Sequence, residues 1–530
     1  MKNTYLSLLL LVAWFAAGCS SDEAASKKSD QQSRPNIIFL LTDDQRDNTF
    51  AAMGHPFVDT PNVDRLLSKS VRFKNTYTAE PVCSPSRVSL LVGMHERVHG
   101  IGFTSAYDLT EEQWERSYPA LLQKAGYFTG FVGKIGIEYY TWKGNAGDKF
   151  NYWWGHDGWT KFLPKNFDSP STNPYHKAKK NVITEIMGEA LGDFLDNTPD
   201  DKPFCLSVSL NVPHGSQTTS MYPDFGDWRK MARPANENPE LQGTRFYDEL
   251  YRDLEIEIPD KTATDPYRFI PRHMLDQDEG RKTSTYQYSY TRETNTEHHI
   301  RYYQTIAGLD YVIGEFVKDL ESRGLMDNTI IIYGSDHGLL MGEYGMGGKS
   351  LLYDLASKIP CFIYDPNAPA SQKGSTNEEL VSSLDITRTI LDYAGVNAVD
   401  FMSGKSLQPL VRGEAIEWRD ELFLESLYTG RDNPFQEGIR MGKWKYIRMF
   451  DGVKRAYTEG HVDFAGRDPG FEMLFDLEAD PAELNNLAGK KEVAGILNTL
   501  REKCAAQSIA LNEKREAFKK VVATTARKKR

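Results

Sequence analysis

The chain has 530 residues, of which 40% are hydrophobic and 26% are charged, and its formal net charge is −11. The length allows about three domains, and we expect one large α/β core with one smaller unit. The composition excludes collagen-like, coiled-coil and wholly disordered chains. The acidic balance argues against a nucleic-acid partner, because no net basic field is available to capture phosphates.

The N-terminus has the features of an export signal. Lys2 precedes an apolar run over residues 6–17 that is too short to span a membrane, which favours a signal peptide over a buried helix. The run ends in Ala-Ala-Gly-Cys19, which resembles a bacterial lipobox and implies lipidation of Cys19. Residues 20–33 are polar and small, as in a flexible tether. We therefore expect an exported lipoprotein of a Gram-negative bacterium, in the periplasm or on the cell surface, with membrane contact through the N-terminal lipid only.

The body of the chain alternates between strand and helix patterns. A spacing of apolar residues from Tyr302 to Leu320, followed by Gly324, predicts an amphipathic helix. Apolar, β-branched runs predict buried parallel strands at residues 36–41, 204–210, 329–333 and 361–364. This alternation predicts an α/β fold with a large, mostly parallel (mixed) sheet flanked by helices.

The sequence pattern changes near residue 421, where short strands separated by polar loops begin. These strands are predicted at residues 421–427, 439–449 and 472–477, and a Lys/Arg-rich helix follows them. We expect a small C-terminal α+β domain with a short antiparallel sheet. The predicted division is a signal peptide (1–19), a tether (20–33), a catalytic domain (34–420) and the C-terminal domain (421–530).

We also predict where two further groups of residues lie. Residues 215–300 are polar and irregular, so we expect a long excursion at the rim of the active site. Four basic residues of the C-terminal strands are predicted to lie on a solvated face: Arg440, Lys443, Lys445 and Arg448.

The cysteines of the mature chain argue against a zinc site or a disulfide framework. Cys83, Cys205, Cys361 and Cys504 are far apart and form no Cys-x-x-Cys pair. Cys205 and Cys361 lie in apolar runs and are predicted to be inert core thiols. Cys83 differs, because its neighbours are Pro, Ser and Arg.

Polar side chains follow three of the predicted strands. Asp43 and Asp44 follow the first, His214 follows the second, and Asp336 and His337 follow the third. Each alone has an ordinary explanation as a cap or loop residue. Because ligands bind beyond the carboxyl ends of parallel strands, we expect these side chains to gather at one edge of the sheet. Carboxylate oxygens favour Ca²⁺ or Mg²⁺ over zinc.

Cys83 begins a predicted helix. Pro85 suits a first helical turn, and Val88 and Leu91 give the buried stripe. The backbone N–H groups and the dipole at a helix N-terminus favour an anion, which Arg87 one turn later could neutralise. The alternative is a helix-capping cysteine beside a surface arginine.

Several motifs, in a fixed order, carry a resemblance to a known family. Residues 83–87 (Cys-x-Pro-Ser-Arg) resemble the first signature of the type I sulfatases of the alkaline-phosphatase superfamily, and residues 126–134 resemble the second. Further matches are the opening strand with its Asp pair at 34–44, Ser-Asp-His-Gly at 335–338 followed by Lys349, and a closing strand near 475–487. The resemblance covers residues 34–490.

The resemblance implies a mechanism. Cys83 would be oxidised to formylglycine (3-oxoalanine) by a formylglycine-generating or radical-SAM maturation enzyme, and its hydrated aldehyde would be the nucleophile. The resemblance assigns Ca²⁺, with Mg²⁺ second, to Asp43, Asp44, modified Cys83, Asp336 and His337. It assigns the sulfate oxygens to Arg87, Lys134 and Lys349. His214 would be the general acid at the leaving oxygen, with Lys349 as a possible assistant.

One position departs from the family pattern. The second signature normally continues Gly-Lys-aromatic-His, but here Gly136 stands at the place of the histidine, which is thought to assist collapse of the sulfated hydrate. Another group fills in, or the step uses water. His99 is a candidate by its closeness in sequence, although a histidine that braces the helix is the favoured alternative.

Aromatic residues suggest, less directly, where a sugar could bind. Residues 139–162 hold nine aromatics, for which a buried cluster is favoured over stacking on sugar rings. His99, His156, Arg272 and His273 are candidates for substrate contacts.

The leading hypothesis is a sulfatase that acts on a sulfated glycan: a glycosaminoglycan, a mucin-type chain or an algal polysaccharide. The alternatives are a phosphonate monoester or phosphodiester hydrolase of the same superfamily, and an inactive glycan-binding relative. The sequence does not identify the sugar or the sulfate position.

Overall fold

The computed structural model describes residues 34–103, 109–137, 145–156, 183–214, 250–256, 265–276, 292–428, 433–451, 462–464 and 466–528. The predicted signal peptide and tether, half of the segment 139–162 and most of the segment 215–300 lie outside these residues. None of the helices that the structure describes combines the length and apolar character that a membrane crossing requires.

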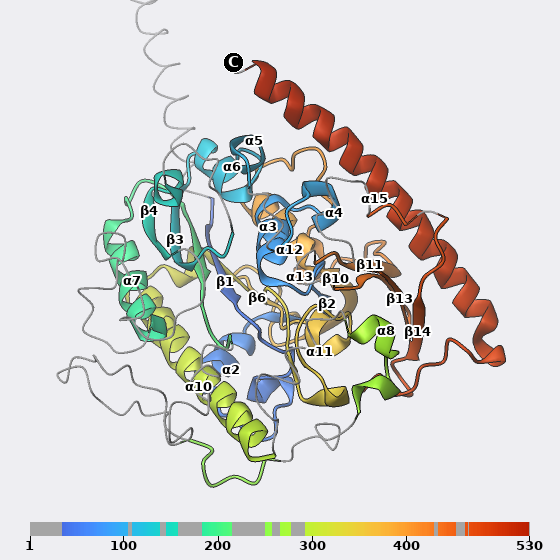
Figure 1. Ribbon diagram of the computed structural model, residues 1–530. Helices are drawn as coiled ribbons and strands as arrows, with labels where there is room; N and C mark the ends of the chain where they lie inside the picture. Colours follow the sequence, from blue (N-terminus) through green and yellow to red (C-terminus); the bar gives the residue numbers. More distant parts are fainter. Residues whose placement is uncertain are drawn as a thin grey trace, which may run out of the picture.

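An eight-stranded sheet forms the centre of the molecule (Figure 1), with the strand order β10-β2-β9-β6-β1-β5-β3-β4. The strands are β1 (Asn36–Thr42), β2 (Val71–Tyr77), β3 (Phe128–Lys134), β4 (Tyr152–His156), β5 (Phe204–Ser209), β6 (Thr329–Ser335), β9 (Phe362–Tyr364) and β10 (Thr376–Ser382). All neighbouring pairs are parallel except those of β9. The predicted α/β fold with a mostly parallel mixed sheet is therefore confirmed.

The prediction of a parallel strand at 361–364 is wrong. β9 lies between β2 and β6 and is antiparallel to both. The chain leaves β6 at its carboxyl end and stays near that edge through β7 (Leu340–Met341), β8 (Gly347–Gly348) and α11 (Asp354–Ser357). It therefore enters β9 from the edge at which β6 ended. An apolar run does not encode this direction.

Helices cover both faces of the sheet (Figure 1). Ile37, Phe39 and Leu41 of β1 face one layer, and the alternating Ile38 and Leu40 face the other, as the two-residue period of a strand requires. The first layer contains α3 (Cys83–Val92), α4 (Glu96–His99), α5 (Glu111–Trp114), α6 (Tyr118–Lys124), α12 (Ser383–Tyr393) and α13 (Gln408–Val411). The second contains α2 (Pro61–Leu67), α7 (Ile183–Asn197) and α10 (Arg292–Ser322).

Helix α10 contains the predicted amphipathic segment. The apolar residues of the predicted stripe are buried: Tyr302, Ile306, Leu309, Ile313, Phe316 and Leu320. Gly324 follows the helix with a left-handed φ of 68°. The helix begins at Arg292, so the irregular excursion predicted to reach residue 300 ends earlier than expected. A short helix, α8 (Arg272–Leu275), also lies within that predicted excursion.

The C-terminal part forms the predicted antiparallel sheet, in the order β11-β12-β13-β14. Its elements are β11 (Glu421–Ser426), β12 (Phe435–Met441), β13 (Trp444–Phe450), β14 (Phe471–Asp476) and the long helix α15 (Ala494–Lys528), which runs along its outer side (Figure 1). The single strand predicted at 439–449 is instead a hairpin. Met441 pairs with Trp444, and Gly442 supplies the positive φ that a two-residue turn needs.

Four basic residues of this sheet were predicted to lie on a solvated face, but three of them are buried. Lys445 has no exposed side-chain surface, and its Nζ pairs with Asp354 at 2.6 Å and Glu483 at 2.9 Å. Arg448 is buried against Glu437, and Arg440 is buried beside Tyr77. Lys443 remains partly exposed beside Asp476. The strands pack on the large domain, and partners such as Asp354 lie too far away in sequence for a local pattern to show them.

Candidate active site

The three strands predicted to carry the polar side chains are adjacent in the sheet, in the order β6-β1-β5. Their carboxyl ends are joined by backbone hydrogen bonds, from Asp43 N to Val212 O at 3.2 Å and from Asp336 N to Thr42 O at 3.0 Å. Asp43, Asp44, Asp336 and His337 are buried there, and His214 is about one-fifth exposed. The structure therefore brings the predicted carboxylates and imidazoles to one edge of the sheet.

Cys83 is the first residue of α3 and points into this group. Its Sγ lies 2.7 Å from Lys349 Nζ, 3.3 Å from His337 Nε2 and 3.7 Å from Asp43 Oδ1. Pro85 occupies the first turn of α3, and Gly93 ends the helix with a left-handed φ of 67°. Residue 83 is 4% exposed, so a reactant must reach it through the cluster itself.

The charge around Cys83 separates it from the other buried thiols. Burial raises the pKa of Cys361 to about 12. Burial acts in the same direction on Cys83, but Lys349 and Lys134 outweigh it and hold the pKa of Cys83 well below its usual range. The site therefore favours a negative charge at residue 83, as expected for a nucleophile.

Lys349 follows the short strand β8, and its position is tied to the start of α3. The backbone N–H of Ser350 donates to the carbonyl of Pro81 at 3.1 Å. Lys349 Nζ donates to Asp44 Oδ1 at 2.9 Å and to Cys83 Sγ. Burial lowers the pKa of Lys349, but Asp44 and Cys83 outweigh burial and raise it well above its usual range, so the ammonium stays charged.

Asp44 adopts a left-handed backbone with a φ of 65°, which is uncommon for a residue other than glycine. Its carbonyl accepts a hydrogen bond from the Tyr302 hydroxyl at 2.9 Å, and its N–H donates to Asp336 Oδ1 at 3.2 Å. His214 Nε2 lies 3.8 Å from Asp44 Oδ2. The turn at the end of β1 thus aims two carboxylates at Cys83 and the imidazole of His214.

Arg87 and Lys134 neutralise the carboxylates from the other side. Arg87 Nε donates to Asp336 Oδ2 at 3.0 Å, and its Nη1 donates to Ser209 Oγ at 2.5 Å. Lys134, the last residue of β3, pairs directly with Asp43 through its Nζ. With Lys349, three cationic side chains surround the carboxylates, which is a suitable environment for an anionic substrate.

Four residues offer ligand atoms that all lie within 4.8 Å of one another: Asp43, Asp44, Cys83 and His337. Asp336 is adjacent, and its Oδ1 accepts the backbone N–H of His337 at 2.9 Å. Burial and the nearby Asp43 raise the pKa of Asp336 to about 6. A donor set with several carboxylate oxygens fits a hard divalent cation.

The residues predicted to contact substrate are not part of this cluster in the described part of the chain. His99 is buried; its Nε2 is 3.0 Å from Ser89 Oγ and its Nδ1 accepts from Ile101 N, contacts that fit the bracing alternative. Arg272, which begins α8 next to His273, is exposed and lies over the ring of Tyr267. Trp153 stacks on Phe131 in the core, in line with the buried aromatic cluster. His156 ends β4, and its side chain is outside the described part.

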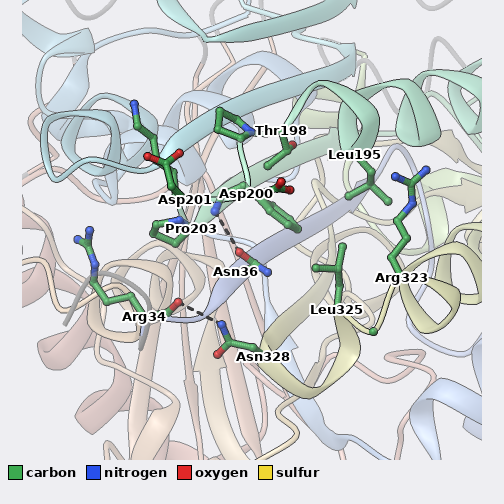
Figure 2. Close-up of a pocket in the computed structure, with 14 residues that line it drawn as sticks. Arg34, Asn36, Leu195, Thr198, Asp200, Asp201, Pro203, Arg323, Leu325 and Asn328 are labelled. Carbon is green, nitrogen blue, oxygen red and sulfur yellow. Dashed lines mark hydrogen bonds between the residues drawn. The ribbon is translucent and has the colours of Figure 1, made fainter. Parts of the chain in front are cut away.

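A pocket of about 520 Å³ opens at the opposite edge of the sheet (Figure 2). It lies where β1 and β5 begin, near Asn36, Asp201 and Arg323, and its charged side chains carry both signs. None of the predicted site residues lines it. The predicted catalytic and metal-ligating residues lie at the carboxyl edge of the sheet instead.

Two residues of the site could not be singled out from the sequence. Ser209 ends β5 and contacts Arg87, and Tyr302 of α10 holds the turn at Asp44. Ser209 is a polar residue in an apolar strand, which is a weak signal. Tyr302 fits the buried stripe of its helix, so nothing in the pattern sets it apart.

Two family models match the chain. A family model described as Sulfatase matches residues 35–396, and one described as N-sulphoglucosamine sulphohydrolase, C-terminal, matches residues 342–510. The first match covers more than half of the chain.

Individual relatives also carry sulfatase names. An N-acetylglucosamine-6-O-sulfatase of Bacteroides thetaiotaomicron is 27% identical, with 93% of this chain and 89% of the relative covered. An ulvan-active sulfatase of Formosa agariphila is 26% identical, with 95% and 87% covered. Solved structures with the same fold include a 2-O GAG sulfatase (19% identity, TM-score 0.66, 92% and 94% covered) and a phosphonate monoester hydrolase of Agrobacterium radiobacter (19%, 0.63, 91% and 96%).

Proposed function

Because the chain belongs to the sulfatase family and is a sulfuric ester hydrolase, we propose that it removes sulfate from a sulfated carbohydrate. One observation carries the assignment of the reaction centre: the buried Cys83 thiol, at the start of a helix, lies 2.7 Å from the charged Lys349 and beside the carboxylate cluster. The names of relatives that act on N-acetylglucosamine sulfate and ulvan support the carbohydrate class.

The nucleophile in this proposal derives from Cys83, which a formylglycine-generating or radical-SAM enzyme oxidises to formylglycine. The hydrated aldehyde supplies a hydroxyl oxygen that attacks the sulfur of the ester, and Cys83 Sγ marks its place. The charges that depress the pKa of the Cys83 thiol would equally favour the deprotonated form of that hydroxyl. The cationic environment therefore serves the nucleophile before and after maturation.

The sulfate group needs positive charge on several sides, and Arg87, Lys134 and Lys349 supply it. All three lie near Cys83 or its carboxylate neighbours, and Arg87 and Lys134 are almost completely buried. In a buried site such fixed charges act with little screening and need no reorganisation during the reaction. They stabilise the negative charge that develops on the sulfate oxygens.

We propose that Asp43, Asp44, Asp336 and His337 hold a divalent cation, Ca²⁺ before Mg²⁺, together with modified residue 83. When bound, the cation would add a positive charge that polarises the sulfate group and acidifies a nearby hydroxyl. The donor chemistry of the cluster supports this choice.

His214 is proposed as the general acid. The alkoxide of a sugar is a poor leaving group, so a proton delivered to the ester oxygen lowers the barrier. His214 follows β5, lies 3.8 Å from Asp44 and is partly exposed, so it borders the site on the side open to a substrate.

A glycan substrate is consistent with a protein that is exported from the cytoplasm. We propose that the mature chain is held at a membrane by a lipid on Cys19, outside the cytoplasm, where a large polysaccharide can reach it. The short apolar run and Cys19 support this proposal.

The test is sulfate release from a panel of sulfated saccharides, with a phosphodiester and a phosphonate monoester included. The protein is expressed with a maturation enzyme, beside Cys83→Ala. The proposal predicts sulfate release from at least one saccharide and none from the variant. Turnover of a phosphoester or phosphonate without any sulfate release would contradict it.

A further inference from the structure

Gly136 has an unusual position beside the reaction centre. It follows β3 with a left-handed φ of 64°, and a Cβ atom added there would lie 2.7 Å from Arg87 Cδ and 3.2 Å from Lys134 Cε. Carbon atoms that do not bond to each other normally stay about 3.5–4.0 Å apart. The space that a side chain at position 136 would need is therefore filled by the stems of two cationic side chains.

Arg87 itself is held closely along its length. Beyond Gly136, its Nε donates to Asp336 and its Nη1 donates to Lys134 O and Ser209 Oγ. Its Nη2 is at ion-pair distance from Asp43 and Asp336 but makes no hydrogen bond to any residue that the structure describes. This buried N–H₂ group is ion-paired with two carboxylates and retains hydrogen-bonding capacity for a ligand.

We propose that Gly136 is a positioning residue that seats Arg87, so that Nη2 faces the bound sulfate group. Any side chain at 136 would push against Arg87 Cδ and shift the guanidinium away from Asp336 and Ser209. The position at which the resembled family carries a histidine has no room for one in this chain. The statement about sulfate rests on the proposed function, whereas the packing of Gly136 on Arg87 does not.

Gly100 provides a matched control. It also has a left-handed φ, of 75°, but a Cβ added there would meet nothing within 4 Å. Alanine therefore introduces backbone strain at both positions and a collision only at 136.

The first experiment compares Gly136→Ala, Gly136→His and Gly100→Ala in the matured enzyme. We expect both variants at 136 to lower kcat/KM at least about tenfold and to raise the inhibition constant of inorganic sulfate, because small displacements of a positioning group are costly. Gly100→Ala should stay within about twofold of the wild type. Equal or higher activity in Gly136→His would overturn the proposal.

A second experiment needs no turnover. Gly136→Ala is made in the wild type and in an Arg87→Ala background, and the unfolding midpoints are compared as a double-mutant cycle. The loss caused by Gly136→Ala should shrink when the Arg87 stem is absent. The same loss in both backgrounds would show that Gly136 acts through backbone strain alone and would overturn the proposal. If no sulfate ester is turned over, this cycle still decides the role of Gly136.

Discussion

Lys349 Nζ lies between Cys83 Sγ and Asp44 Oδ1, 2.7 Å from the first and 2.9 Å from the second. Lys349→Met keeps a stem of similar length and removes the charge. We expect kcat to fall by about 10²–10³-fold, because a fixed cation at the developing charge is lost. The measurement is sulfate release at saturating substrate.

Lys443 gives a control for this substitution. It is a partly exposed lysine in the turn between β12 and β13, and it pairs with Asp476 at the end of β14. Lys443→Met should leave kcat unchanged. A Lys349→Met enzyme with near wild-type kcat would exclude Lys349 from the reaction.

Binding of a divalent cation should stabilise the folded protein. The carboxylates of Asp43, Asp44 and Asp336 are buried close together, and a cation relieves their repulsion. After chelation, Ca²⁺ at about one hundred times its Kd should add about 2.7 kcal/mol to the unfolding free energy. Asp44→Asn should abolish most of this gain. An identical Ca²⁺ response in the Asp44→Asn protein would place the cation elsewhere.

The role of His214 predicts a dependence on the leaving group. His214→Ala should slow hydrolysis of a sugar sulfate by about 10²–10⁴-fold, because a poor leaving group needs a proton. An aryl sulfate with an acidic phenol leaves without one and should be affected far less. Equal losses on both substrates would show that His214 does not act as the general acid.

A pair of buried carboxyl groups away from the active site predicts how stability depends on pH. Glu80 and Glu96 are fully buried between the large domain and Glu425 of β11. Burial raises the pKa of Glu96 to about 8, and burial with the neighbouring Glu96 raises the pKa of Glu80 well above its usual range. In the folded state these carboxyls hold protons that the unfolded chain releases above pH 4.5.

The contribution of these two carboxyls to stability should therefore fall as pH rises from 4.5 to about 8, by about 1.4 kcal/mol per pH unit for each proton held. Glu96→Gln should flatten this slope, because the amide cannot titrate. Glu378→Gln, at an exposed glutamate beside Lys74, should leave the slope unchanged. The measurement is the free energy of unfolding across that range, and an unaltered slope in Glu96→Gln would refute the assignment.

The packing of the C-terminal sheet can be tested at Lys445. Its ammonium has no exposed surface and pairs with Asp354 and Glu483. Lys445→Met leaves the buried Glu483 and the partly buried Asp354 without their cation, so we expect a loss of about 3–5 kcal/mol in the free energy of unfolding. Denaturant unfolding is the measurement, with Lys443→Met as the control. Similar midpoints for both variants would contradict the buried ion pair.

The sequence predicted the gathering of Asp43, Asp44, His214, Asp336 and His337 because one rule of parallel sheets governs them all: the ends of neighbouring strands share an edge. Cys83 was recognisable from its helix start and its motif. The direction of β9 was not, since an apolar run carries no sign of direction.

Long-range contacts explain the other failures. The burial of Lys445 depends on Asp354, 91 residues away in sequence. The contact of Gly136 with Arg87 depends on how β3 and α3 pack, and Tyr302 reaches Asp44 from a helix 258 residues later. Such relationships arise from tertiary packing, which local periodicity does not encode.

The central claim is that residue 83, once modified, is the nucleophile of sulfate ester hydrolysis. The most direct measurement combines the mass of the peptide that contains Cys83 with the rate of sulfate release, in preparations matured to different extents. We predict that the rate is proportional to the fraction that carries the aldehyde and vanishes when only the thiol is present. A rate that is independent of that fraction would contradict the account.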